Sequence, residues 1–170
     1  MTGEAQPSLR GRTRRRDMPL DEAREFLKQQ SVAHVATVGP DGWPYVIPLV
    51  YVYEGGDVIY LHTGARQGHF LTNVQHDNRV CLEVSTMGRL IPGKRHACTS
   101  ALVYTSAVVY GFLKIIDDDD KKNWFFDKLM EKHGDPSWEL EPGYPLIDRI
   151  ILYELEIETL TAKNSTGLGH

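Results

Sequence analysis

The stretch WPYVIPLVYVYEGGDVIYLHTGARQGHF, residues 43–70, decides the fold of this chain. Its first eleven residues are an apolar run of strand-favouring residues, and VIYLH at 58–62 is a second such run. The two glycines between the runs are typical of a tight hairpin turn. A short loop then leads into GHFLTNVQ at 68–75, which favours a short helix. The stretch therefore predicts an antiparallel strand pair followed by a loop and a helix.

Further strands and helices are predicted on both sides of this stretch. The predicted strands are residues 31–38, 43–53, 58–62, 79–85, 100–116 and 153–159, and the predicted helices are residues 19–30, 68–75 and 121–134, the last opened by the acidic run 117–120. Residues 86–99 are expected to form a long loop, and Gly111 to bend the long strand that contains it. Six mostly hairpin-linked strands with three helices predict a mainly β fold, an antiparallel barrel with peripheral helices.

Composition and charge exclude several classes of protein. The chain has 170 residues, 41% of them hydrophobic and 25% charged, which is typical of one soluble domain. It shows no apolar run long enough to span a bilayer and no secretory leader, and its cysteines, Cys81 and Cys98, are too few for a disulfide framework. We therefore expect a cytoplasmic protein with no membrane partner.

The net charge of −4 is unevenly distributed. Residues 1–20 carry five arginines against Glu4 and Asp17, a balance of +3, so the remainder carries −7. A nucleic-acid-binding surface on the folded body is therefore not expected. Residues 1–16 are predicted to be a disordered basic tail, for which a weak contact with RNA or an acidic partner is the alternative to plain solvation.

No familiar catalytic motif is present. The sequence contains no phosphate-binding Gly-Lys-Ser/Thr loop, no dinucleotide glycine fingerprint, no nucleophile elbow and no HExxH. His62, His69 and His76 recur every seven residues, but His62 ends a strand, so the three do not share a helical face. The sequence accordingly predicts neither a metal site nor a particular catalytic side chain.

The loop between the second strand and the short helix could bind an anion. Free backbone N–H groups at a helix start favour negative charge, and Thr63, Arg66 and His69 add three side-chain donors. The alternative is a plain connector in which Arg66 points into solvent.

The strand at 43–53 carries a second hint of a ligand. One apolar face can fill the barrel, whereas the other face needs a cover, either a second subunit or a flat apolar ligand. Pro48 cannot donate to a ladder, so strand pairing is expected to lapse or bend there and leave backbone groups for a ligand. An edge strand or bulge without a ligand is the alternative.

Two polar residues stand inside predicted strands. His34 is expected to be a structural histidine of the core or of a subunit interface. Glu83 shares a face with Cys81 and, if that face is inward, needs a basic partner, for which Arg149 and Lys163 are candidates.

Four segments, in this order, resemble one known family: PDGWPYVIPLVY, IYLHTGARQGHF, NRVCLEV and YTSAVVYG. They are similar to the pyridoxamine phosphate oxidase-related FMN-binding split barrels, and most to the nitroimidazole-resistance and flavin-nucleotide-binding branch. The resemblance implies one six-stranded split-barrel domain over residues 17–163, with residues 164–170 as a C-terminal tail.

The resemblance also implies a homodimer with FMN between the subunits. Its ring would lie along Val46, Ile47, Pro48 and Leu49; its phosphate would meet His62, Thr63, Gly64, Arg66, Gly68 and His69; and Tyr104 and Ser106, from one chain or the other, would complete the pocket. Where many relatives read Gly-Arg-Lys this chain reads Gly68-His69-Phe70, so a phosphate-binding lysine is missing and Arg66 is expected to compensate.

The function implied is that of an FMN-dependent oxidoreductase acting on a small planar substrate, with nitro-aromatic reduction as one candidate reaction. A true pyridoxamine phosphate oxidase is disfavoured, because the family's arginine- and histidine-bearing substrate segment has no match in the C-terminal residues 153–170. The alternative is a non-catalytic carrier or sensor of flavin or haem. Deazaflavin and haem are the alternative cofactors.

Overall fold

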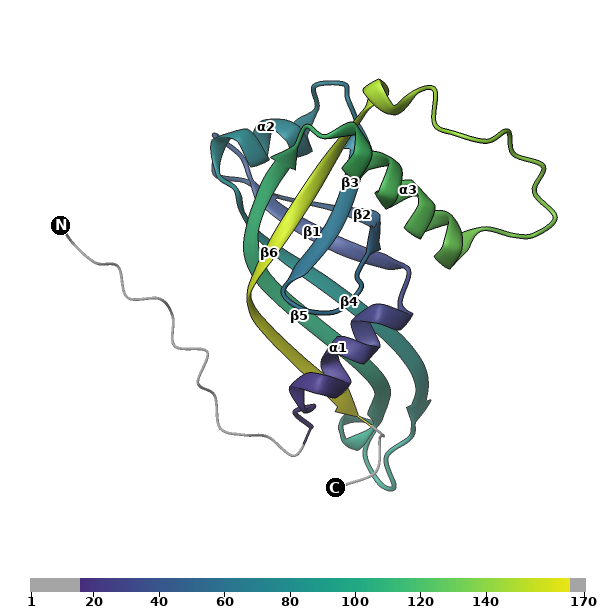
Figure 1. The fold of residues 1–170 in the computed structure, drawn as a ribbon. Helices are drawn as coiled ribbons and strands as arrows, with labels where there is room; N and C mark the ends of the chain where they lie inside the picture. The colour runs from purple at the N-terminus through teal and green to yellow at the C-terminus, as the bar shows by residue number, and fades with distance from the viewer. Residues whose placement is uncertain (1–15, 166–170) are drawn as a thin grey trace.

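The computed structural model describes residues 16–165, so the basic tail predicted over residues 1–16 lies outside it except for Arg16. The three helices are α1 (Leu20–Gln29), α2 (His69–His76) and α3 (Asp119–His133). The six strands are β1 (Val32–Val38), β2 (Pro44–Val52), β3 (Val58–Gly64), β4 (Arg79–Ile91), β5 (Ala101–Ile116) and β6 (Ile150–Ser165), and two short 3-10 turns are η1 (Ala97–Thr99) and η2 (Ile147–Arg149). Figure 1 shows the strands curling around one axis, with the helices outside them.

The strands form a closed barrel in the order β1-β2-β3-β6-β5-β4, and every pair is antiparallel. This confirms the predicted six-stranded antiparallel barrel with peripheral helices. The strand pairs differ greatly in length. Strand β5 pairs along most of its length with both neighbours, whereas β2 pairs with β3 only at Tyr51–Leu61 and Val52–Tyr60. The barrel is therefore split between β2 and β3, where residues 44–50 of β2 pair with β1 alone.

Gly111 bends β5 as predicted. The register of β5 against β6 shifts between Tyr110 and Gly111, which marks a β-bulge. A Cβ at Gly111 would stand 2.0 Å from the carbonyl oxygen of Glu156, so the two backbones approach too closely for any side chain there. The glycine thus lets a sixteen-residue strand turn the corner of the barrel.

Two segment boundaries differ from the prediction. Residues 86–91, expected within a loop, continue β4, because β5 keeps pairing with β4 through a register shift between Met87 and Leu90. Strand β6 is also longer than the alternating run at 153–159 indicates, since β3 pairs with its first half and β5 with nearly all of it. Its last residues, Asn164 and Ser165, had been expected in the C-terminal tail.

Two apolar clusters hold the structure together. The larger fills the barrel, with Leu27, Tyr51, Ile59, Leu61, Leu82, Val109 and Leu155 among its most buried members. The smaller lies between α3 and the outside of β2 and β6, where Phe125 and Leu129 pack on Val52 and Leu152. Helix α1 packs against β5 and β6, α2 against β1, and α3 against β2. Much of the outer face of β1, β4 and β5 therefore carries no helix of the described chain.

Polar contacts fix α1 and α3. The Asp118 carboxylate caps α3 by accepting from the N–H of Lys121 at 2.9 Å, which confirms the capping role predicted for the acidic run. The Tyr51 hydroxyl donates to the carbonyl of Leu27 at 2.5 Å, and Lys132 of α3 donates to the carbonyl of Gln30 after α1. No helix of residues 16–165 is long and apolar enough to cross a membrane.

Candidate functional site

The free edge of β2, residues 44–50, is the first part of the site. Tyr45, Ile47 and Leu49 are half-buried against the barrel core, while Val46 faces outward and is 59% exposed. The lapse in pairing expected at Pro48 occurs on the β3 side, whereas on the β1 side Pro48 stays in register opposite His34. A proline is tolerated in such an edge position, because no strand on that side needs a hydrogen bond from the N–H that proline lacks. The edge leaves backbone groups of β2 open to a ligand.

The outer face of β2 is covered only in part. This face was expected to need a second subunit or a ligand, but α3 of the same chain supplies a cover at one end, packing on Val50 and Val52. The expectation is therefore wrong for this end of the strand, because α3, which lies more than sixty residues later in the chain, packs on it in the smaller apolar cluster. Val46 remains outside that cover.

The second part of the site is the loop that connects β3 to α2. The N–H of Ala65 donates to the carbonyl of Arg149 at 2.8 Å, which ties the loop to the turn before β6. Gly68 precedes the helix and offers no side-chain cap, and the first intrahelical bond is that from the N–H of Thr72 to the Gly68 carbonyl at 2.9 Å. The N–H groups of the first turn therefore point out of the helix without a side-chain acceptor, which is the arrangement that binds anions.

The Arg66 and His69 side chains beside this loop are accessible to solvent. Arg66 is exposed and forms no ion pair with any described residue, and His69 is also exposed at the helix start. The His69 ring lies 5.5 Å from the Tyr45 ring, centroid to centroid. Tyr45 thus brings the free edge of β2 and the start of α2 into one neighbourhood.

Thr63 is positioned by a residue that the sequence reasoning missed. Its Oγ1 lies 3.0 Å from the Tyr153 hydroxyl, and the Tyr153 ring meets Phe70 edge-on at 5.4 Å. Burial raises the pKa of Tyr153, so its hydroxyl stays protonated. Phe70, which stands where the resemblance implies a lysine, is buried in the barrel core. In YELEIET, residues 153–159, apolar residues alternate with glutamates, and this alternation is the sequence signal that puts Tyr153 on the buried face.

His62 lies away from the other phosphate-site candidates. It precedes Thr63 on β3, and neighbouring strand residues point to opposite faces, so His62 packs against Phe125 and Phe126 of α3 at 5.2 and 5.3 Å between ring centroids. Its Nδ1 is buried without a hydrogen-bond partner, and burial lowers its pKa, which favours the neutral ring. His62 and Thr63 of one chain therefore do not converge on one anion.

Tyr104 and Ser106 are also separated from this neighbourhood. They lie on the outer face of β5 opposite Met87 and Ser85, whereas Phe112 pairs with Arg79 just after α2. Eight residues of strand at about 3.3 Å each put Tyr104 roughly 26 Å from Phe112 along β5. Within one chain, Tyr104 and Ser106 therefore lie toward the end of β5 that is far from the residues following α2.

The partner of Glu83 is His34 and not one of the two predicted basic residues. The His34 Nδ1 lies 3.5 Å from a carboxylate oxygen of Glu83, because the two residues are opposite one another on β1 and β4. Their face is the outer one, and both side chains are accessible to solvent at 58% and 35% exposure. Neither Arg149 nor Lys163 is needed to satisfy a buried charge.

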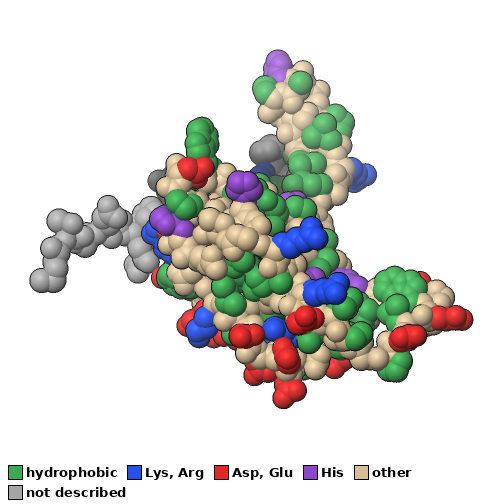
Figure 2. Space-filling view, turned by 90° about the horizontal axis from the view of Figure 1, so that it is seen from above, with side chains coloured by type: hydrophobic (Ala, Val, Ile, Leu, Met, Phe, Trp, Pro, Cys, Tyr) green, Lys and Arg blue, Asp and Glu red, His purple; other side chains and the backbone are tan. Residues whose placement is uncertain are grey.

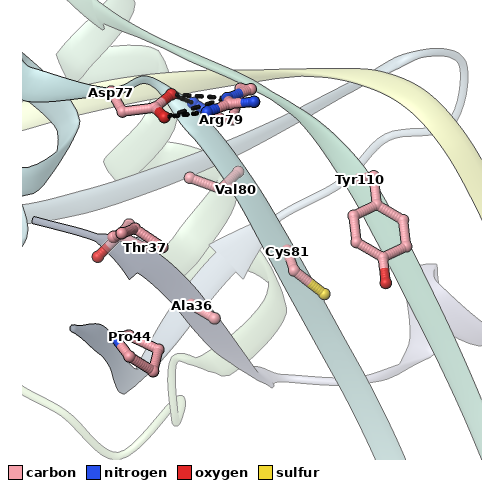
Figure 3. A pocket seen from close by; sticks show the side chains of 9 residues that line it. Ala36, Thr37, Pro44, Asp77, Arg79, Val80, Cys81 and Tyr110 are labelled. Atoms are coloured by element: carbon pink, nitrogen blue, oxygen red, sulfur yellow. Dashed lines mark hydrogen bonds and ion pairs between the residues drawn. The ribbon is translucent and has the colours of Figure 1, made fainter. Parts of the chain in front are cut away.

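A separate apolar hollow of about 300 Å³ opens on this outer face. Figure 3 shows its lining from β1, β2, β4 and β5, with the Cys81 sulfur turned toward the Tyr110 ring. Burial raises the pKa of the Cys81 thiol, so the group is not a ready nucleophile. At its rim Asp77 accepts from the guanidinium of Arg79, which lowers the pKa of Asp77 to about 2. Within residues 16–165 no group of three or more His, Cys, Asp or Glu is placed to hold a metal ion.

Comparisons with known proteins give a consistent picture. The family model for pyridoxamine 5'-phosphate oxidase matches residues 19–164. A candidate 5-nitroimidazole antibiotic resistance protein from Bacteroides thetaiotaomicron has a similar structure, with a TM-score of 0.71 at 22% identity over 86% of this chain and 85% of that one. So does the FAD and heme binding protein from Mycobacterium smegmatis, with a TM-score of 0.74 at 22% identity over 89% and 74% of the two chains. The flavocytochrome Anf3 from Azotobacter vinelandii gives 0.71 at 24% identity over 89% and 71%. A search of curated proteins found no match.

Proposed function

Because this chain belongs to the pyridoxamine 5'-phosphate oxidase family, we propose that it is a flavin-dependent oxidoreductase that binds FMN beside the free edge of β2. One observation carries the proposal. The split between β2 and β3 lies next to a helix start without a side-chain cap, and the Tyr45–His69 ring contact joins the two. The flavin ring would bind along the edge of β2, and its phosphate would bind next to it at the start of α2.

The residues present suit the phosphate without the family's usual lysine. The N–H groups of the first turn of α2, the Thr63 hydroxyl and the exposed Arg66 and His69 can surround a dianion from several sides. We do not include His62 of the same chain, because it packs under α3. The side chains of Val46, Ile47, Pro48 and Leu49 lie along the edge where the ring would stack.

Bound FMN would supply the redox chemistry, which is hydride transfer at the flavin ring. The chain's own part is to hold the phosphate, to offer backbone groups of β2 to the polar edge of the ring and to leave one ring face open to a small planar substrate. This division of work agrees with the lack of a nucleophile motif in the sequence. Nitro-aromatic compounds are the substrate class that we would test first.

We further propose that two copies of the chain form a dimer through the outer face of β1, β4 and β5. Large apolar side chains stand exposed on this face and its borders, namely Val32, Val38, Val46, Tyr110 and Phe112, at 38% to 59% exposure. Apolar faces of this kind usually mark an interface. A partner packed here could also supply Tyr104 and Ser106 to the site.

The proposed cofactor site is tested by the molecule that copurifies and by one substitution. We expect denatured protein to release FMN, identified by its mass, and Arg66→Ala to weaken FMN binding by about 1.5–3 kcal/mol, the usual size of a charge-assisted hydrogen bond. Lys28→Ala removes an exposed cation on α1 and serves as the matched control. Equal FMN affinity of Arg66→Ala and the control would remove Arg66 from the site.

A second candidate function is a carrier or sensor that binds flavin or haem without turnover. It is supported by the two structural relatives whose names include haem binding or a flavocytochrome. Absorbance separates the cases, since haem gives a Soret band and flavin does not. If bound flavin is reduced by NADH or NADPH and reoxidised by a nitroimidazole, the protein is an enzyme, and if no physiological donor reduces it, the carrier function stands.

A further inference from the structure

Two segments project from the barrel and expose large apolar side chains. The first, here termed the acidic arm, is residues 135–146 between α3 and η2, and it exposes Trp138, Leu140 and Leu146 by 52%, 67% and 56%. It contains three carboxylates and no lysine or arginine. In Figure 1 the arm loops outward beyond α3, and in Figure 2 it is the projection on which red and green side chains meet.

The acidic arm is anchored at its base. The Tyr144 hydroxyl donates to the Asp127 carboxylate at 2.8 Å, and the Tyr144 ring packs on Phe126 of α3 at 5.3 Å. Burial and the Asp127 charge raise the pKa of Tyr144 to about 12, which keeps the hydroxyl a donor. Near the other end the N–H of Ser137 donates to the carboxylate of Asp135 at 2.8 Å. The arm therefore presents Trp138 and Leu140 from a fixed base.

The second segment, here termed the basic hairpin, is residues 87–99, which comprise the end of β4 and the connection to β5. It contains Arg89, Lys94 and Arg95 and no carboxylate, a charge of +3 against −3 for the acidic arm. Met87 and Leu90 are exposed by 66% and 67%. Its backbone is fixed by hydrogen bonds, from the Gly93 N–H to the Ser100 Oγ at 3.1 Å and from the Thr99 Oγ1 to the carbonyl of His96 at 2.8 Å.

The two segments of one chain lie at different ends of the barrel. The acidic arm follows α3 at the upper end in Figure 1, and the basic hairpin closes the lower end. In a two-fold dimer with the two barrels antiparallel, each lower end lies beside the partner's upper end. This is the arrangement that would also carry Tyr104 and Ser106 toward the partner's flavin site, because they stand on β5 close to the hairpin.

We propose that the acidic arm of each subunit docks on the basic hairpin of the other, which gives two equivalent contacts in a dimer of this chain. The inference rests on the proposed dimer and names a contact beyond its sheet face. Trp138 and the arginines are the residue types that most often anchor interfaces. Opposite charges would set the pairing and its rate, while the apolar side chains would add most of the buried area.

A charge swap between the two segments tests the contact. The arm variant carries Glu139→Lys and Glu141→Lys, the hairpin variant carries Lys94→Glu and Arg95→Glu, and the swap variant carries all four changes. Subunit exchange between two differently labelled full-length dimers is measured at low salt. We expect each variant alone to exchange about tenfold faster than the wild type, and the swap variant to return to within about threefold of it.

The control and the contrary results separate the inference from the proposed function. Glu22→Lys with Glu25→Lys reverses two exposed charges on α1 and should leave the exchange rate unchanged. A swap variant that exchanges as fast as the product of its two parts, or single variants that exchange like the wild type, would overturn the arm–hairpin contact and leave the dimer standing. A wild type that sediments as a monomer would overturn the contact and the dimer together, and FMN titration of that monomer then reports on the flavin site by itself.

Discussion

Strand β2 contains two regions that share one apolar pattern and end in different surroundings. Its last residues, Tyr51 and Val52, pair with β3, lie under α1 and α3 and are almost fully buried. Its first residues, 44–50, pair on one side only, and Val46 among them is 59% exposed. The difference arises from the pairing with β3 and from α3, which covers one end of the strand and not the other. The closed region supplies stability, and the open region is where a ligand or a partner can bind.

The largest expected effect is a loss of stability when the apolar cluster over the closed region is disrupted. Phe125→Ala removes a fully buried ring from the centre of the α3 cluster, so the free energy of unfolding should fall by about 3–5 kcal/mol in urea titrations. Residues 46–49, where the flavin ring would lie, are not part of this cluster, so the FMN affinity of the folded variant should stay close to that of the wild type.

The control for this substitution is an exposed aromatic residue next to the open region. Trp43 precedes β2 and is 74% exposed, so Trp43→Ala should cost less than about 1 kcal/mol. Equal losses for Phe125→Ala and Trp43→Ala would show that the stability of the barrel does not depend on the α3 cluster.

A pair of matched substitutions on one face of β2 sharpens the comparison. Val46 and Val50 both face outward, but Val50 packs under α3 while Val46 lies outside the helix. Val50→Asp places a carboxylate against the apolar cluster and should cost about 2–3 kcal/mol, whereas Val46→Asp should change the unfolding of the monomer by less than about 0.5 kcal/mol.

The same pair tests the proposed interface. Unfolding and sedimentation are measured at several protein concentrations, and Val46→Asp should shift the equilibrium toward monomer because a charge then stands in the dimer face. If Val46→Asp instead lowers stability at every concentration as much as Val50→Asp does, the open region is not open in solution.

The difference between the two regions also marks what the sequence can reveal. Alternating and continuous apolar runs, turn glycines and the bend at Gly111 were enough to predict six strands in an antiparallel barrel, because these features depend on neighbours close in the chain. The order of the strands in the barrel was not predicted, since β3 pairs with β6 and β1 with β4. The cover over Val50 was not predictable, since nothing within the strand indicates that α3 returns to it. The candidate site shows the same limit: the pattern placed Thr63, Arg66 and His69 on one loop, but the Tyr45–His69 and Thr63–Tyr153 contacts join residues far apart in the chain.

A smaller effect is expected from the residue that positions Thr63. Tyr153→Phe keeps the ring on Phe70 and removes the hydroxyl that lies 3.0 Å from the Thr63 Oγ1. Loss of one hydrogen bond should lower the free energy of unfolding by about 0.5–1.5 kcal/mol. If Thr63 binds the phosphate, FMN affinity should fall as well, and Thr63→Val should then make the Tyr153→Phe change nearly silent in FMN titrations. Two independent, additive losses of FMN affinity would mean that Tyr153 does not act through Thr63.

The smallest expected effect is on the pH dependence of stability, and it concerns His62, which is buried under the same helix α3 as the closed region. Burial against α3 lowers the pKa of His62 below its ordinary value of 6.5, so the folded protein keeps this ring neutral after the unfolded chain has taken up a proton. The unfolded state therefore binds more protons below about pH 6.5. As the pH is lowered from there, the free energy of unfolding decreases until the folded ring is protonated as well. His62→Gln should flatten this part of the curve of unfolding free energy against pH. It should not abolish the slope, because burial and Lys132 also lower the pKa of His133.

The control is His76→Gln, which removes an exposed histidine at the end of α2 and should leave the curve unchanged. If the curves of unfolding free energy against pH are parallel for His62→Gln and the wild type, burial of His62 in the folded protein does not affect its protonation.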